Sequence, residues 1–398
     1  MRTWLWSWKR KAMGGSWMPE NPMTQTATPG TAQAIGERLH KVAQGLIGQL
    51  PDTQTGQLYE RAAQCLTQLP EPGSEAWKYS PVNRLYESLV STASSAASQK
   101  AGTPEATEAA ELLESVDLKR YPLAAVAALD LHHANRIVAK SGDSITLNSA
   151  DAGNHWTHIE VPDNVHATLI QRQQPDSGAL QVTTVNLGAG ASLDHAMTGC
   201  ANPGTRWHLL SVKQLANSNY SLHQLSLGGA LERIDTHVRL MGTGANATLT
   251  GALLCGDRDR CDNQTVLEHA APRCTSTARY HGLANHQGKL TFGGRIHILE
   301  DGAGTDARLH NPNLLLSDDA EINTKPELEI YNDDVACAHG ATVGQLDEAA
   351  VFYLRSRGIT RSRANALLLR GFVREAVGGP DADYAQELTE QRLAAWTL

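Results

Sequence analysis

The sequence contains few aromatic and cysteine residues and no long apolar run. Phenylalanine occurs three times in 398 residues. No stretch approaches 18 consecutive apolar residues, so no transmembrane helix and no membrane partner are expected. The six cysteines form no CxxC pair and no regular framework. In a chain of this length such cysteine usage favours reduced thiols and a cytoplasmic location.

Sequence patterns of self-contained catalysis are missing as well. There is no G-x-S-x-G and no H-E-x-x-H motif. The only Gly-Lys pair, Gly288-Lys289, is followed by leucine and lacks the P-loop frame. The 34 basic and 42 acidic residues leave a formal charge of −8, without the basic field that nucleic acid requires. Neither a bound nucleotide nor nucleic acid is expected, and any ATP-driven step needs a partner ATPase.

Composition and hydrophobic periodicity along the sequence predict a leader and three structural parts. Residues 1–29 are predicted to be a disordered leader, in which the apolar stretch covers only residues 4–8 and the basic residues follow it, unlike a secretory signal. Residues 30–139 read as an N-terminal helical domain. Helical periodicity covers residues 31–69, interrupted by a turn at 51–56, and returns near 104–115.

Residues 140–340 change to short alternating runs separated by Gly, Asn and Asp, which predict strands. Turns recur about every ten residues, as in a sandwich, a barrel or a solenoid. About 200 residues without a helical break, and without a hairpin Asn-Gly turn, favour a parallel β-helix. The fold class is therefore mainly β with flanking α.

Residues 341–398 return to a helical pattern. Residues 346–358 begin with acids and end with Arg355, Arg357 and Gly358, which complements the helix dipole and suits a left-handed cap. Thr360 is expected to cap a second helix, with an apolar stripe of Ala364, Leu367, Leu368, Phe372 and Val373. Phe352 and Phe372 both lie in this helical pair. Two roles are open for this helical pair: a plain cap on the β-core, or a surface that docks a partner.

The Cys337-x-His339 pair is the first candidate for chemistry. On a strand the two side chains project to one face, roughly 7 Å apart. Thiolate and imidazole suit zinc, copper or iron–sulfur centres, but two ligands are fewer than the usual four. The pair therefore either shares a site with ligands from elsewhere or binds no metal.

Two other groups of residues are candidate sites beside the Cys337-x-His339 pair. Asp318, Asp319, Asp333 and Asp334 would suit a stand-alone β-helix enzyme acting on carbohydrate, although such residues are also typical of tight turns. Cysteines at 255, 261 and 274 with His269 suggest zinc, but their spacing is not that of common structural sites.

Several segments resemble one protein family. The run "NLLLSDDAEINTKPELEIYNDDVACAHGATVGQLDEAAVFYLRSRGI" closely resembles the C-terminal signature of the SufB/SufD family of iron–sulfur cluster assembly scaffolds, and within it the SufD branch. "EAWKYSP" at 75–81, "QTVLEHAAPRCTS" and "GGRIHI" are similar to its N-terminal and middle parts. The resemblance covers about residues 30–376.

This resemblance implies a right-handed parallel β-helix between helical domains, pairing with SufB through the β-helix cores. It also implies that the C-terminal helices bind the ATPase SufC, for which Phe352, Arg355, Arg357, Leu368 and Phe372 are the candidate contacts. His339, with Cys337, would contribute to a transient iron or iron–sulfur cluster site completed by SufB. The isolated chain could form a homodimer.

Overall fold

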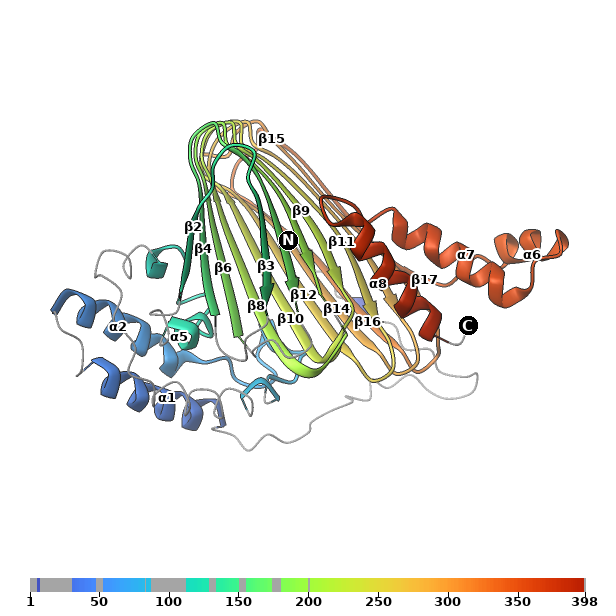
Figure 1. Cartoon of the computed structure of the whole chain (residues 1–398), viewed down its shortest axis with the longest axis horizontal. Coiled ribbons are helices and arrows are strands. Elements are labelled where there is room, and N and C mark those ends of the chain that lie inside the picture. The colour runs from blue at the N-terminus through green and yellow to red at the C-terminus, as the bar shows by residue number, and fades with distance from the viewer. Residues whose placement is uncertain are drawn as a thin grey trace.

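The computed structural model describes residues 6–7, 31–47, 53–82, 84–86, 112–128, 134–149, 155–173, 180–199 and 201–396. Most of the expected leader and most of the helix expected near 104–115 lie outside these ranges. Two long sheets dominate the described part, and helices lie at both ends of the chain (Figure 1). Among the described helices, none has the length and apolar character needed to span a bilayer.

The two sheets form the walls of a parallel β-solenoid, which confirms the predicted fold class. Sheet A contains β2 (Asn135–Val138), β4 (His155–Val161), β6 (Leu180–Leu187), β8 (Asn202–Gln214), β10 (Gly229–Leu240), β12 (Arg260–His269), β14 (Lys289–Ile298) and β16 (Glu321–Ile330). Sheet B contains β3 (Ser144–Ser149), β5 (His166–Gln173), β7 (Ser192–Thr198), β9 (Asn219–Ser226), β11 (Asn246–Cys255), β13 (Thr275–Ala284), β15 (Thr305–Leu315) and β17 (Val335–Gly344). The hand of the solenoid stays a prediction.

Each strand pairs in parallel with the strand one coil further along. Parallel strands need a crossover, and here the intervening strand of the other sheet supplies it. The coils lengthen along the chain: Asn135 pairs with Thr157, 22 positions on, whereas Lys289 pairs with Glu321, 32 positions on. The solenoid therefore widens from its first coil to its last.

The turns from sheet A to sheet B share one backbone device. Seven of the eight turns, all except the one between β16 and β17, place one residue in the left-handed region, which glycine and asparagine adopt at little cost. The backbone N–H of this residue donates to a carbonyl one coil further along, at 2.7–3.2 Å. The residues are Gly142, Asn164, Gly190, Asn217, Gly244, Arg273 and Gly304. The hydrogen-bond ladder thus continues through the corners, which explains why Gly and Asn separate the strands in the sequence.

The interior of the solenoid has an apolar part and a polar part. Most inward side chains are aliphatic and form one continuous buried cluster. Beside it, buried polar side chains bond to one another from coil to coil at 2.8–3.0 Å, which satisfies groups that would be costly to bury alone. In the early coils these are Gln171, Thr183, His195, His208 and Tyr220.

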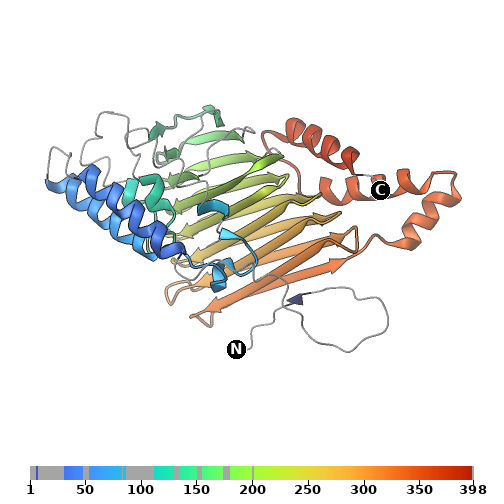
Figure 2. The same cartoon turned by 90° about the horizontal axis from the view of Figure 1, so that it is seen from below.

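The N-terminal helices cover the outer face of sheet A (Figure 2). They are α1 (Thr31–Ile47), α2 (Thr53–Cys65), the 3-10 turns η1 (Leu66–Gln68) and η2 (Glu75–Trp77), and α5 (Ala124–Ala127). Their apolar sides pack with Trp156 and Trp207 of sheet A. Helix α2 begins at Thr53, inside the segment expected to be a turn, and so includes Gly56. The buried packing of Ala62 and Ala63 offsets the cost of a helical glycine, about 1 kcal/mol.

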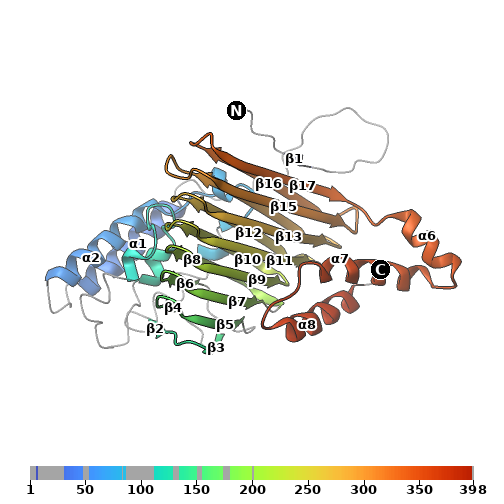
Figure 3. The ribbon, with the colours of Figure 1, turned by 90° about the horizontal axis from the view of Figure 1, so that it is seen from above.

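The C-terminal helices α6 (Glu348–Ser356), α7 (Arg361–Arg374) and α8 (Ala382–Ala395) follow sheet B, and α7 and α8 pack on its outer face (Figure 3). Asp347 and Thr360 cap α6 and α7 through their side chains, and Gly358 has a φ of 83°. The cap at Thr360 and the left-handed Gly358 confirm the predictions, whereas Asp347 was expected inside the first turn and instead precedes the helix as its cap. The stripe of α7 was partly wrong: Leu369 is fully buried, whereas Leu367 is 41% exposed.

We expect the stability of the fold to fall as the pH drops below about 6.5. Burial lowers the pKa of His195 and of His208 to about 3, whereas histidine in an unfolded chain titrates near 6.5. Because the pKa of each histidine is lower in the folded state, neither histidine lowers the free energy of unfolding above pH 6.5. Each histidine then costs about 1.4 kcal/mol per pH unit below that value, until the pH reaches the folded pKa.

Urea unfolding between pH 7.5 and pH 4.5 would measure this slope. The variant His195→Gln should have a shallower slope, because glutamine does not titrate. His310→Gln is the matched control, since His310 is exposed on β15. An unchanged slope in His195→Gln would contradict the assignment.

Candidate functional site

The last coil of the solenoid, β16 and β17, is open on its outer side. Strand β17 pairs with β15, and no strand of the described residues lies beyond it. Of the strands that the structure describes, β1 (Trp6–Ser7) alone pairs with the outer edge of β16, in antiparallel register. No residue of β17 is buried, whereas β15 alternates buried and exposed positions. An open edge presents unpaired backbone N–H and C=O groups, which another chain can pair with.

Cys337 and His339 lie on this open strand and share one face. In the parallel register Cys337 lies opposite Ala307 and His339 opposite Leu309, and both partners are buried in the solenoid core. Register partners point the same way, so both side chains are directed inward. Cys337 is half-buried and packs against the core, whereas His339 is exposed. The last coil thus leaves an inward-facing histidine open to solvent.

The two side chains differ in their readiness to bind a metal. Burial raises the pKa of the Cys337 thiol above its usual value, so the sulfur is protonated near neutral pH. The exposed imidazole of His339 is the more accessible donor. Within the described ranges, no three His, Cys, Asp or Glu side chains are placed to hold a metal ion. The pair is therefore half of a coordination shell at most.

Apolar side chains at the end of β16 extend this open surface. Ile330 is 37% exposed and Tyr331, directly after the strand, is 57% exposed. Exposed large apolar groups beside a free strand edge are typical of an interaction surface. Neither residue is among the candidates expected from the sequence, although "ELEIY" places both directly after Glu329 at the end of the strand.

Helix α6 presents an aromatic and basic surface away from the solenoid. Phe352 is 71% exposed and Tyr353 is 56% exposed. The guanidinium of Arg357 lies over the Tyr353 ring, 4.5 Å from its centroid, and donates to its hydroxyl at 2.5 Å. Arg355 is exposed on the same helix. The geometry therefore leaves Phe352, Arg355 and Arg357 accessible to a partner.

Phe372 and Leu368 lie on α7, and each is half-buried. The Phe372 ring lies 4.6 Å from the His281 ring of β13, centroid to centroid. His281 Nδ1–H donates to the Phe372 carbonyl at 2.8 Å. Phe372 therefore holds α7 against sheet B, in addition to any contact that it makes with a partner.

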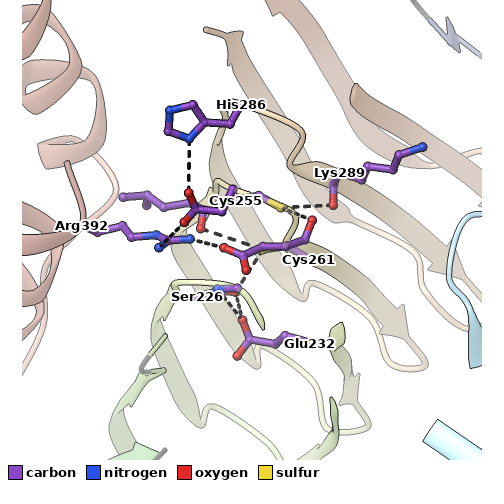
Figure 4. Close-up of polar contacts among 11 residues, drawn as sticks. Ser226, Glu232, Cys255, Cys261, His286, Lys289 and Arg392 are labelled. Carbon is purple, nitrogen blue, oxygen red and sulfur yellow. Dashed lines mark hydrogen bonds and ion pairs between the residues drawn. The ribbon is translucent and has the colours of Figure 1, made fainter. Parts of the chain in front are cut away.

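The cysteines considered for zinc do not converge with His269. Cys255 and Cys261 meet at one corner of the solenoid, where the Cys255 thiol donates to the carbonyls of Asp259 and Lys289 (Figure 4). His269 ends the ten-residue β12 on the other side, and Cys274 follows it. Ten residues of strand span about 30 Å. The zinc alternative therefore has no geometric support.

The four aspartates considered for carbohydrate chemistry are dispersed as well. Asp318 and Asp319 lie in the turn before β16, whereas Asp333 and Asp334 lie in the turn after it. The ten residues of β16 separate the pairs by about 30 Å. Paired catalytic carboxylates lie within about 10 Å of each other. These residues act as turn residues.

The described chain is thus a parallel β-solenoid with helices on both outer faces and a Cys-x-His pair on its open last strand. Residues 145–372 match the family described as SUF system FeS cluster assembly, SufBD core domain. Because this match covers more than half of the sequence, the chain belongs to this family.

Characterised relatives agree with the family match. The iron–sulfur cluster assembly protein SufD of Escherichia coli is 33% identical over 223 residues, which cover 55% of this chain and 53% of the relative. A SufBD family protein of Synechocystis is 30% identical over 206 residues, or 51% of this chain and 45% of the relative. A family member of Mycobacterium leprae is 32% identical over 161 residues, which cover 38% of this chain and 41% of the relative. The chain thus spans about half the length of these relatives.

We expect two phenylalanine substitutions to differ in their effect on stability. Phe372→Asp places a charge beside His281 at the helix–sheet contact and should destabilise the attachment of α7 by about 2–4 kcal/mol. Phe352→Asp changes an exposed side chain and should cost no more than about 0.5 kcal/mol. Hydrogen exchange of the α7 amides would distinguish them. Equal protection in both variants would show that Phe372 does not hold α7 in place.

Proposed function

We propose that this chain is a non-ATPase scaffold subunit of a SUF assembly complex, in which it pairs with SufB and carries SufC. The observation that carries the proposal is the open last coil, which combines a free strand edge with Cys337 and His339. The family match supports the SUF assignment. The cytoplasmic location expected from the cysteine usage stays a prediction.

The free edge of β17 supports SufB as the pairing partner. A second solenoid with a similar open coil could align its last strands along β17, satisfy its backbone groups and cover Ile330 and Tyr331. The same edge also permits a homodimer of the isolated chain. SufB is the partner expected in the complete system, because the chain belongs to the SufBD family of the SUF system.

Iron or a nascent iron–sulfur cluster would be cargo at this interface, not a resident cofactor. His339 would supply an imidazole nitrogen, Cys337 would contribute a thiolate once it loses its proton, and SufB would supply the remaining ligands. A shell divided between two subunits can be opened by moving one of them. This arrangement suits a scaffold that must release its product.

The exposed surface of α6 supports the second contact. Phe352, Arg355 and Arg357 would bind SufC, which would hydrolyse ATP for the complex. Leu368 and Phe372 on α7 would connect that contact to sheet B. A stand-alone carbohydrate enzyme, the alternative function, loses its support because the four aspartates do not converge.

His339→Ala should abolish cluster assembly while leaving the complex intact, and Cys337→Ala should have a smaller effect. His339 is the exposed donor, whereas the Cys337 thiol is half-buried and protonated. The measurement is iron and acid-labile sulfide in the complex co-expressed with SufB and SufC and purified without oxygen. His310→Ala, an exposed histidine on the neighbouring strand, is the control. Full cluster content in His339→Ala would refute the ligand role.

Ile330→Glu should weaken pairing with SufB, because it places a charge at the open coil. Loss of one buried isoleucine side chain, about 1.5–3 kcal/mol, corresponds to roughly a ten- to hundredfold weaker complex. Size-exclusion chromatography of the three co-expressed proteins tests this. Val138→Glu is the matched control, since Val138 is 53% exposed on β2 in the first coil.

Failure of the wild-type proteins to co-elute would sink the assembly proposal. Equal loss of SufB from both variants would show that pairing does not use the last coil. For SufC, Phe352→Asp should reduce co-purification without changing α7 protection. Phe372→Asp should reduce both, and unchanged SufC binding in Phe372→Asp would show that Phe372 is only a packing residue.

A further inference from the structure

A cavity of about 520 Å³ lies on the outer face of sheet A, beneath the segment that carries Trp77. Outward side chains of β10, β12, β14 and β16 form its floor, and residues near 74–79 and 119–123 form its walls. This volume is typical of small-molecule pockets. The scaffold role proposed above makes no use of it. We refer to this cavity as the sheet A pocket.

The floor of the sheet A pocket is flat because of one row of aligned positions across the strands. The parallel register aligns Asp235, Gln264, Gly293 and Lys325 across four strands. A Cβ atom on Gly293 would lie only 2.0 Å from Gln264 Oε1. Glycine at this position therefore lets the Gln264 side chain lie across β14 instead of standing up into the cavity.

A buried arginine holds the wall over this floor. Arg233 is 4% exposed, and its guanidinium binds Asp235 at 2.9 Å and Asp262 at 2.8 Å. The same guanidinium stacks on the Trp77 ring, 3.8 Å from the centroid. The charge of Arg233 is thus balanced by two carboxylates, and its role is to fix the Trp77 segment. The pocket is preformed.

Ion pairs also balance the basic residues at the far side of the floor. Lys325 binds Glu75 at 2.7 Å and Glu327 at 3.0 Å, which ties the wall to β16. Arg295 binds Glu327 at 3.2 Å and Glu329 at 3.6 Å. These cations therefore already have anionic partners within the protein.

Three other cations that line the pocket lack such partners. No acid in the described ranges forms an ion pair with Lys78, Lys119 or Arg120. Lys78 lies 5.3 Å from the Tyr79 ring centroid and Arg120 lies 5.7 Å from that of Tyr121. The lining holds six basic and four acidic residues, on a chain whose formal charge is −8. The pocket is thus locally positive, and its uncompensated charge lies on one side.

We propose that the sheet A pocket binds a small organic anion, whose carboxylate or phosphate oxygens contact Lys78, Lys119 and Arg120. Unpaired cations beside a preformed concave surface are the groups that recognise such oxygens. Tyr79, which lines the pocket and is half-buried, offers apolar ring surface for the body of the ligand. The binding needs neither SufB nor SufC, so its test is independent of the assembly proposal.

Isothermal titration of the full chain tests the pocket with three probes. Citrate supplies carboxylates, adenosine monophosphate supplies a phosphate, and adenosine is its uncharged counterpart. At least one anion should bind, and adenosine should bind at least tenfold more weakly than its monophosphate if the phosphate is the recognised group. The double variant Lys119→Gln/Arg120→Gln should weaken anion binding at least about tenfold, since each charge-assisted bond contributes about 1.5–3 kcal/mol.

The double variant Lys41→Gln/Lys140→Gln is the matched control. It removes the same charge from exposed sites outside the lining, and it should leave binding unchanged. Binding of citrate alone would assign carboxylates, and binding of adenosine monophosphate alone would assign phosphates. The proposal is overturned if neither anion binds. Equal weakening in the two double variants would also overturn it, because general charge attraction would then explain the binding.

Discussion

The structure depends on parallel pairing between successive coils. Each inner strand takes its backbone hydrogen bonds from the coils on either side, and the turn ladder extends these bonds around the corner. The inward side chains are buried by the same neighbours. Among the described residues, a coil at either end of the solenoid has such a neighbour on one side only.

The last coil, β16 and β17, shows the consequence of this pairing between successive coils. No described strand follows β17 at its outer edge, so its backbone groups there are unpaired within the described structure, and His339 stays exposed although it faces inward. In an inner coil, the same position is occupied by a buried leucine, Leu309. An inward histidine is tolerated at this position because nothing among the described residues covers it. The fold thus leaves a free strand edge and an exposed imidazole at one place.

The helical parts use the two outer faces for different purposes. The N-terminal helices bury tryptophans on sheet A and leave the sheet A pocket beside them. The C-terminal helices attach to sheet B through α7 and α8, where Arg392 binds Asp257 and Asp259 at a corner of the solenoid (Figure 4). Helix α6 then extends beyond this attachment. Its exposed aromatic residues are held at a distance from the sheet.

Local features of the sequence predicted much of this architecture. The alternating runs marked the strands, Gly and Asn marked the turns, and Thr360 and Gly358 marked the ends of helices. These signals are local, because they arise from backbone preferences of a few adjacent residues. The position of the α7 stripe was partly missed, since both Leu367 and Leu369 suit a helix and only the position of sheet B selects Leu369.

The sequence by itself determined the fold class, the alternation that puts Cys337 and His339 on one face, and the family resemblance. Only the tertiary structure decided that this face is open, that Phe372 contacts His281 across 91 positions, and that two sets of candidate residues do not converge. It also brought Trp77 and Arg233 together beside the pocket. Such contacts join residues far apart in the chain, and their distances depend on how many coils lie between them.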